Sequence, residues 1–194
     1  MINNKNMRIL FENWDSVKND YINQEIDLSY EPTLTDFISK NNLSKYLSKV
    51  GYITLDTTLK CQYRVSILDN LKKENQWAYV LVIDGKIVKF GDTTKTLNDR
   101  WGSYSAGIKE NRDRGTCSTT NYFISEVIRQ YLKEGFEVEL WGYNIPTEFI
   151  TIDVFGESKK AVIDVVTYYE SKLLELYQTT YNKLPILGKN GLTK

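Results

Sequence analysis

The chain has 194 residues, 41% of them hydrophobic, and its 25 basic residues balance its 25 acidic ones. The charge balance excludes a protein that coats nucleic acid through bulk positive charge, and the 14 tyrosines and 4 tryptophans exclude a disordered chain. The chain has no histidine, which excludes Ser-His and Cys-His nucleophile pairs and histidine-ligated zinc. Any general base must therefore be Tyr, Lys, Asp or Glu, or a metal-bound water.

The cellular compartment follows from the amino terminus and the cysteines. The first residues lack the apolar stretch of a signal peptide, and no segment approaches the length that spans a membrane. Cys61 and Cys117 stand far apart and without the spacing of metal ligands. We therefore expect a reduced, cytoplasmic protein.

Residues 1–70 have a mixed pattern, and we expect them to form a partly helical accessory region. Two short helices are predicted on either side of the turn-prone Asn41-Asn42. Their apolar residues recur at roughly helical spacing: Phe37, Ile38, Leu43, Tyr46, Leu47 and Val50.

A β-hairpin is predicted where the apolar run WAYVLVI (77–83) is followed by Asp84-Gly85 and KIVKF (86–90). Two registers are possible. A two-residue loop pairs Ile83 with Lys86, which places Tyr79 and Lys89 on opposite faces. A three-residue loop pairs Val82 with Lys86 instead, which places Tyr79 directly opposite Lys89.

Burial favours the three-residue loop, because that register gathers one apolar set on a single face of the sheet. Tyr79 and Lys89 then share the other face. Taken alone, Lys89 is typical of an edge strand that discourages aggregation, and Tyr79 is typical of a packed aromatic. The apolar set consists of Val80, Val82, Val88 and Phe90.

The later elements alternate between helices and a strand. A short helix begins near Thr96, which forms a capping box with Asp99, and its apolar stripe is Leu97, Trp101 and Tyr104. A polar loop (107–118), a helix from Ser118 or Thr119 to Gly135, a strand (136–144) and a long helix (158–178) follow. The order predicts an α/β (α+β) sandwich of helices around a small antiparallel sheet.

Two charged residues stand out on these helices. Glu170 lies within the apolar stripe of the last helix, where an ionised carboxylate needs a cation or several donors. A structural ion pair and a metal ligand are both consistent with that position. Arg100 lies at the edge of the stripe of its own helix, where it is either a surface arginine or a residue that holds a phosphate through two parallel hydrogen bonds.

Together these positions resemble the motifs of the GIY-YIG nuclease superfamily over residues 76–191. Tyr79 corresponds to the tyrosine of the first motif, whose glycine and isoleucine are missing here. Gly91 corresponds to the glycine of the second motif, and Lys89 replaces its tyrosine, as in some type II restriction endonucleases of the family. Residues 118–144 are also similar to the middle of a phage GIY-YIG endonuclease.

The resemblance extends to the remaining site residues. Arg100, followed one turn later by Tyr104, matches the arginine of the family, and Glu170 matches its metal-binding glutamate. The trailing asparagine of the family fits Asn190 better than Asn182. The resemblance divides the chain into an accessory region (1–70) and a GIY-YIG-like nuclease domain (71–194).

The function that this resemblance implies is a Mg²⁺-dependent endonuclease that hydrolyses phosphodiester bonds of double-stranded DNA, most simply a type II restriction endonuclease. The alternatives are a phage or mobile-element endonuclease with loose site preference and a non-catalytic DNA-binding protein on the same scaffold. Glu170 would hold one Mg²⁺ per active site and Arg100 would stabilise the charge of the transition state. Lys89 or Tyr79 would take the proton of the attacking water, and Tyr104 would contact that water or the phosphate.

DNA contacts outside this site fall on the polar loop. Lys109, Arg112 and Arg114 are candidates for contacts to the DNA backbone, although a solvated charged loop explains them equally well. A palindromic target would imply a homodimer with one active site per strand. Residues 1–70 or the loop at 105–118 would then read bases or contribute to dimerisation.

Overall fold

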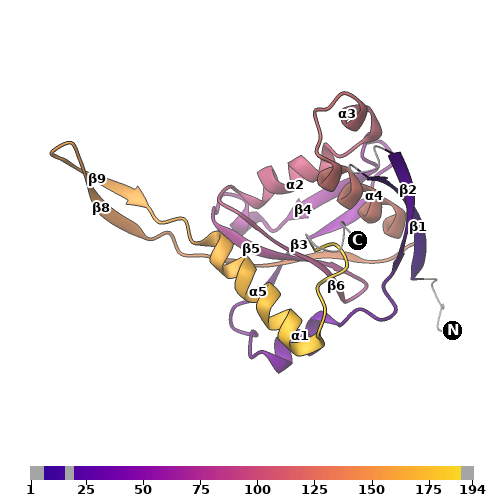
Figure 1. Ribbon diagram of the computed structural model, residues 1–194, viewed down its shortest axis with the longest axis horizontal. Coiled ribbons are helices and arrows are strands. Elements are labelled where there is room, and N and C mark those ends of the chain that lie inside the picture. The colour runs from indigo at the N-terminus through magenta and orange to yellow at the C-terminus, as the bar shows by residue number, and fades with distance from the viewer. Residues whose placement is uncertain (1–6, 16–19, 189–194) are drawn as a thin grey trace.

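The computed structural model describes residues 7–15 and 20–188, in which an antiparallel five-stranded sheet lies between two layers of helices (Figure 1). This confirms the predicted α/β sandwich. The strand order is β4-β3-β7-β5-β6, so that β4 and β6 form the two edges. The strands are β3 (Ser48–Leu55), β4 (Tyr63–Ile67), β5 (Trp77–Ile83), β6 (Lys86–Thr93) and β7 (Val138–Asn144).

One face of the sheet is covered by α2 (Leu97–Ser105) and α4 (Thr119–Lys133). Both helices begin where their sequences predict. The Thr96 hydroxyl accepts a hydrogen bond from the backbone N–H of Asp99 (3.1 Å) and donates to its carboxylate (2.7 Å), which confirms Thr96 as the cap of α2. Ser118, rather than Thr119, caps α4, and Gly135 follows its end at a φ of 76°.

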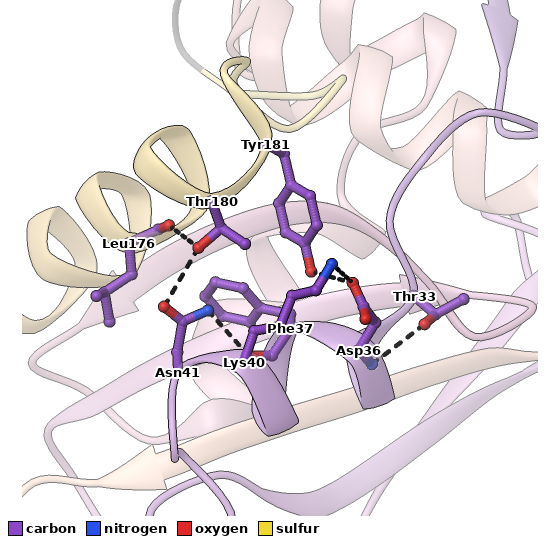
Figure 2. A network of polar contacts seen from close by, with 8 residues as sticks. All are labelled: Thr33, Asp36, Phe37, Lys40, Asn41, Leu176, Thr180 and Tyr181. Atoms are coloured by element: carbon purple, nitrogen blue, oxygen red, sulfur yellow. Dashed lines mark hydrogen bonds and ion pairs between the residues drawn. The ribbon is translucent and has the colours of Figure 1, made fainter.

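The opposite face is covered by α5 (Val166–Tyr181) and α1 (Leu34–Lys40). Figure 2 shows how polar contacts join these two helices. The Tyr181 hydroxyl donates to Asp36 (2.8 Å), which also pairs with Lys40 (2.8 Å), and the Thr180 hydroxyl donates to Asn41 (3.3 Å). The carboxyl-terminal half of α5 is thereby fixed against α1.

The amino-terminal region is mostly strands rather than helices. The hairpin of β1 (Arg8–Asp15) and β2 (Asp20–Asp27) packs on α4, where the Tyr131 hydroxyl bonds to the carbonyls of Met7 (2.8 Å) and Ile26 (3.1 Å). The first of the two helices expected there is α1, but the second is wrong, because residues 48–55 form β3. The boundary expected between residues 70 and 71 runs through the sheet, since β3 and β4 precede it and β5 follows it.

The segment between β7 and α5 forms a two-stranded arm. It consists of β8 (Phe149–Val154) and β9 (Glu157–Val162), and it projects from the body at one end of the molecule (Figure 1). The long helix expected from residue 158 is therefore wrong in its first part, because α5 begins only at Val166. Short helical turns occur at η1 (Asp69–Leu71) and at α3 (Lys109–Asp113), the latter within the expected polar loop.

Cys61 and Cys117 are both free and buried. Within the described ranges, no helix combines the length and the apolar character needed to cross a membrane.

Candidate active site

The β5–β6 hairpin turns through two residues, so the expected three-residue loop is wrong. Ile83 pairs with Lys86 across Asp84 and Gly85, whose φ values of 50° and 75° are both positive. Two adjacent positive φ values are typical of a type I′ turn, in which the dipeptide Asp-Gly is favoured. If this register continued along the hairpin, Tyr79 and Lys89 would lie on opposite faces of the sheet.

A β-bulge returns the two side chains to one face of the sheet, although the direct pairing expected between Tyr79 and Lys89 is wrong. The register shifts between Leu81 and Val82, so that Val82 pairs with Ile87 but Leu81 pairs with Lys89. The extra residue, Val88, packs on the α2 side and not with the apolar set expected for it. Tyr79 then pairs with Gly91 and is the diagonal neighbour of Lys89 on one face, at a distance of roughly 7 Å that long side chains can bridge.

Gly91 makes room for the phenol of Tyr79. A β-carbon at position 91 would lie 2.3 Å from both the Cζ and the hydroxyl oxygen of Tyr79, closer than side chains can approach. The ring therefore extends across β6, which is the edge strand of the sheet. Neighbouring segments cover the first half of that edge, since the Ile87 N–H donates to Pro32 (3.0 Å) and the Leu187 N–H to Val88 (2.9 Å). The phenol thus reaches the second half of the edge.

Two phenols and one guanidinium converge at this position. The Arg100 Nε donates to the Tyr79 hydroxyl (2.9 Å), and its Nη2 donates to the Tyr104 hydroxyl (2.8 Å). The two hydroxyls are themselves 2.8 Å apart and hydrogen-bonded. The ring of Trp101 packs on both phenols, with centroid distances of 5.5 Å to Tyr79 and 4.9 Å to Tyr104. Three of the residues expected to form a site therefore make one polar cluster, held on α2 and β5, in which the two phenols are buried and Arg100 is half-buried.

Burial and charge set the ionisation of this cluster. Burial raises the pKa of Tyr79 above its usual value, although Arg100 and the hydrogen bond from Tyr104 act in the opposite direction. Burial and the neighbouring Tyr79 raise the pKa of Tyr104 further. Burial alone would lower the pKa of Arg100, but the two phenols reverse this effect and the net shift is upward. At neutral pH the cluster is therefore two neutral phenols and one cation.

The charge of Glu170 acts on the cluster from the other layer of helices. It is 8% exposed and shares the buried stripe of α5 with Val166, Leu173 and Tyr177, as the sequence predicts. Its negative charge contributes to the raised pKa of both Tyr79 and Tyr104. Because α5 packs against β5 and β6, the carboxylate lies within electrostatic reach of the phenols at the edge of the sheet.

A magnesium ion fits the ligands that the chain offers. In the described part of the chain no group of three or more acidic, cysteine or histidine side chains is arranged to hold a metal. Mg²⁺ does not need such a cage, because it keeps several waters and binds through one or two carboxylates together with substrate phosphates. Glu170 supplies one carboxylate, which suits this mode of binding.

Two further residues bear on the site. Lys89 is buried, with 5% exposure, on the face that carries Tyr79. Asp92, which the sequence motifs did not single out, contributes to the raised pKa of Arg100. The sequence signal for Asp92 was its position directly after Gly91 in KFGDT, because a residue next to the motif glycine lies close to the same part of the sheet edge.

The basic residues of the polar loop lie on or beside α3, which Figure 1 places on the opposite side of the molecule from α5. Lys109 pairs with Asp113 (3.8 Å), and Arg114 donates to the side chain of Asn111 (2.6 Å). The side-chain Nε of Arg112 is buried. Asn190 lies outside the described residues, and Asn182 ends α5 in the left-handed conformation at a φ of 54°.

The fold is similar to that of two solved nuclease structures. The restriction endonuclease HPY188I, in complex with product DNA, is 29% identical, with coverage of 82% of this chain and 87% of that chain and a TM-score of 0.56. A mutant of bacteriophage T4 EndoII is 20% identical, with coverage of 78% of this chain and 99% of that chain and a TM-score of 0.51. No protein-family model matches the chain, and no curated protein matches it.

Proposed function

We propose that the protein is a Mg²⁺-dependent endonuclease of the GIY-YIG type that hydrolyses phosphodiester bonds of double-stranded DNA. The observation that carries the proposal is the convergence of Tyr79, Arg100 and Tyr104 within reach of the charge of Glu170. The likeness to a restriction endonuclease that was solved with its product DNA supports it.

Arg100 is suited to hold a phosphate. A guanidinium has five N–H groups, and the two hydrogen bonds to the phenols use two of them. Those bonds fix the plane of the guanidinium before substrate binds, so the other N–H groups can meet phosphate oxygens without further ordering. The role proposed for Arg100 is to stabilise the negative charge that develops on the phosphate.

The phenol pair can direct one proton toward the substrate. Both phenol oxygens accept a hydrogen bond from Arg100, and one phenol hydrogen lies between the two oxygens. The second phenol hydrogen is left to orient the attacking water or to bond to the phosphate. Tyr79 or Lys89, neighbours on one face, takes the proton of the water; the tyrosine does so only as a phenolate and the lysine only as a neutral amine.

Glu170 is the residue proposed to hold the metal, one ion per site. When bound, Mg²⁺ would supply positive charge to the phosphate and to the leaving oxygen. The position of Glu170 among apolar side chains of α5 keeps the carboxylate in one place, because its neighbours in the stripe are packed against the sheet.

Cleavage of defined DNA by the full chain tests the proposal, with Glu170→Gln compared with Glu175→Gln. Glu175 lies on the same helix but is exposed and paired with Lys172 (2.8 Å), so its substitution should leave cleavage unchanged. Glu170→Gln should abolish Mg²⁺-dependent cleavage while DNA binding persists. Equal cleavage by the two variants, or a wild type that cuts no DNA with Mg²⁺ or Mn²⁺ at any salt concentration, would refute the proposal.

The products distinguish a type II restriction endonuclease, which we propose, from a nuclease with loose site preference. A restriction endonuclease cuts a long DNA into discrete fragments with identical end sequences, and a palindromic site would require two copies of the chain. Binding of DNA without cleavage would favour a non-catalytic DNA-binding protein. Cytoplasmic location agrees with the two free cysteines and is part of the proposal.

A further inference from the structure

The β8–β9 arm carries an apolar row that its own hairpin does not bury. All six residues of β8 are exposed. Ile150, Ile152 and Val154 alternate along β8 and therefore lie on one face, where they pair with Ala161, Lys159 and Glu157. The other face carries mostly polar side chains beyond the Phe149–Val162 pair at its base. A two-stranded hairpin is marginally stable by itself in water, so a contact that covers the apolar row would stabilise the arm.

The turn at the tip of the arm contains a bulky residue in an unfavourable backbone conformation. Phe155 and Gly156 form the turn with φ values of 53° and 89°. Positive φ is uncommon for a bulky residue, and Asn-Gly or Asp-Gly is the preferred pair in such a turn. The Phe155 side chain is also fully exposed, at 103% of its reference area. An exposed aromatic ring in a strained position is better explained by a contact that it makes than by the hairpin that it closes.

The same chain contains an apolar groove beside the root of the arm. A cavity of about 280 Å³ lies between α5, the ends of β5 and β7, and the segment after α1, and its lining is mostly apolar. Tyr46, Tyr143 and Tyr169 form its aromatic wall, with centroid distances of 5.6 Å between successive rings. A cavity of roughly 150 Å³ holds a benzene-sized ring. The groove therefore has room for the side chain of Phe155.

We propose that the arm of one copy of the chain docks on a second copy and inserts Phe155 into the groove beside Tyr46, Tyr143 and Tyr169. The exchange is reciprocal, because each copy carries both the arm and the groove and twofold symmetry satisfies both. It goes beyond the nuclease function and does not depend on it, since its evidence lies in the arm and the groove and its readout is the assembly state.

Charge favours a protein occupant over DNA. The arm carries Asp153 and Glu157 against Lys159 and Lys160, and Lys159 pairs with Glu157 (2.8 Å). A ribbon that enters a DNA groove needs excess positive charge, which this arm lacks, whereas an apolar row with a charged rim is the composition of a protein interface.

The area also suffices for a stable dimer. Phe155 is 103% exposed and presents roughly 200 Å² of apolar surface on each arm, so two rings and the surfaces that they cover give about 800 Å². The row of Ile150, Ile152 and Val154, which are 48%, 39% and 37% exposed, extends this area toward about 1,200 Å², the lower limit for stable interfaces.

The test measures the dimer dissociation constant of the full chain by sedimentation over a dilution series. Phe155→Asn removes the ring and at the same time creates the favoured Asn-Gly turn, so the arm keeps its fold. The dissociation constant should rise about a hundredfold or more, because a twofold interface loses the ring twice. Thr151→Asn, on the polar face of the arm, is the matched control and should leave dimerisation unchanged.

Disulfide trapping identifies the receiving surface. Phe155→Cys and Tyr46→Cys variants of different mass are mixed and oxidised, and a heterodisulfide that needs both cysteines supports insertion into the groove. Disulfides only between two Phe155→Cys chains, or a dimer that Phe155→Asn does not weaken, would overturn the proposal. A monomeric wild type whose DNA binding falls in Phe155→Asn would also overturn it and would assign the arm to DNA.

Discussion

Substitution of Gly91 by alanine tests whether the position of the Tyr79 phenol matters for catalysis. Gly91 is the residue over which that ring passes, and it contributes no functional group of its own. Its replacement therefore changes the proposed active site only by moving Tyr79.

The size of the displacement follows from the contacts. The alanine β-carbon would lie 2.3 Å from the hydroxyl oxygen and 2.7 Å from Cε2 of Tyr79, whereas ordinary contacts begin at 3.4 Å. The ring must move by about 1 Å, which breaks its hydrogen bonds to Arg100 (2.9 Å) and Tyr104 (2.8 Å). A displacement of this size in a catalytic group costs roughly a hundredfold in rate, and overpacking costs about 1–3 kcal/mol of stability.

Single-turnover DNA cleavage with Mg²⁺ gives the rate, and urea unfolding followed by circular dichroism gives the stability. Gly102→Ala is the matched control, because Gly102 lies on α2 two residues after Arg100 and a β-carbon there meets nothing within 4 Å. It should gain roughly 0.5–1 kcal/mol of helix stability and cleave at the wild-type rate. A folded Gly91→Ala protein that cleaves as fast as the wild type would refute the proposed role of Tyr79.

Two further predictions concern stability. Burial raises the pKa of Tyr63 to about 12, so its contribution to stability is complete below pH 10 and is lost as the pH rises toward 12. The Tyr63 share of the free energy of unfolding should fall by about 1.4 kcal/mol per pH unit in that interval, and the raised pKa values of Tyr79 and Tyr104 add to the total loss. Equal stability at pH 9 and pH 12 by urea unfolding would contradict this. Tyr181→Phe removes the hydroxyl that donates to Asp36 and should lower the free energy of unfolding by about 1 kcal/mol. Tyr168→Phe, at an exposed position, should not change it measurably. Equal losses in the two variants would contradict the proposed link between α1 and α5.

The sequence predicts local elements where their signals lie within a few residues. The helix cap at Thr96, the cap at Ser118 and the hairpin at Asp84-Gly85 are all present, because each depends on neighbouring residues only. By contrast, β3 pairs with β7, some 90 residues later, and its apolar residues resembled a short helix without that partner.

The candidate site was predictable in part for the same reason. Tyr79 and Arg100 follow from motif spacing, and the apolar stripe of α5 correctly places Glu170 in a buried position. The bulge at Val88 has no sequence signal, so the face shared by Tyr79 and Lys89 was predicted correctly from a wrong loop length. The start of α5 was predicted too early because residues 158–162 were assigned to the helix. They form β9, whose partner β8 shows the alternation of a strand at Ile150, Ile152 and Val154.

The bulge in β6 also constrains how the length of this hairpin can change. A regular two-residue hairpin of the present length would pair Val80 with Lys89 and place that lysine on the other face, away from Tyr79, which β7 anchors through its pairing with Gly142. Deletion of one residue among 86–88 would remove the bulge but keep Leu81 paired with Lys89, so the two side chains would stay on one face. Homologous chains that retain both groups should therefore carry either this bulge or one residue fewer in the hairpin.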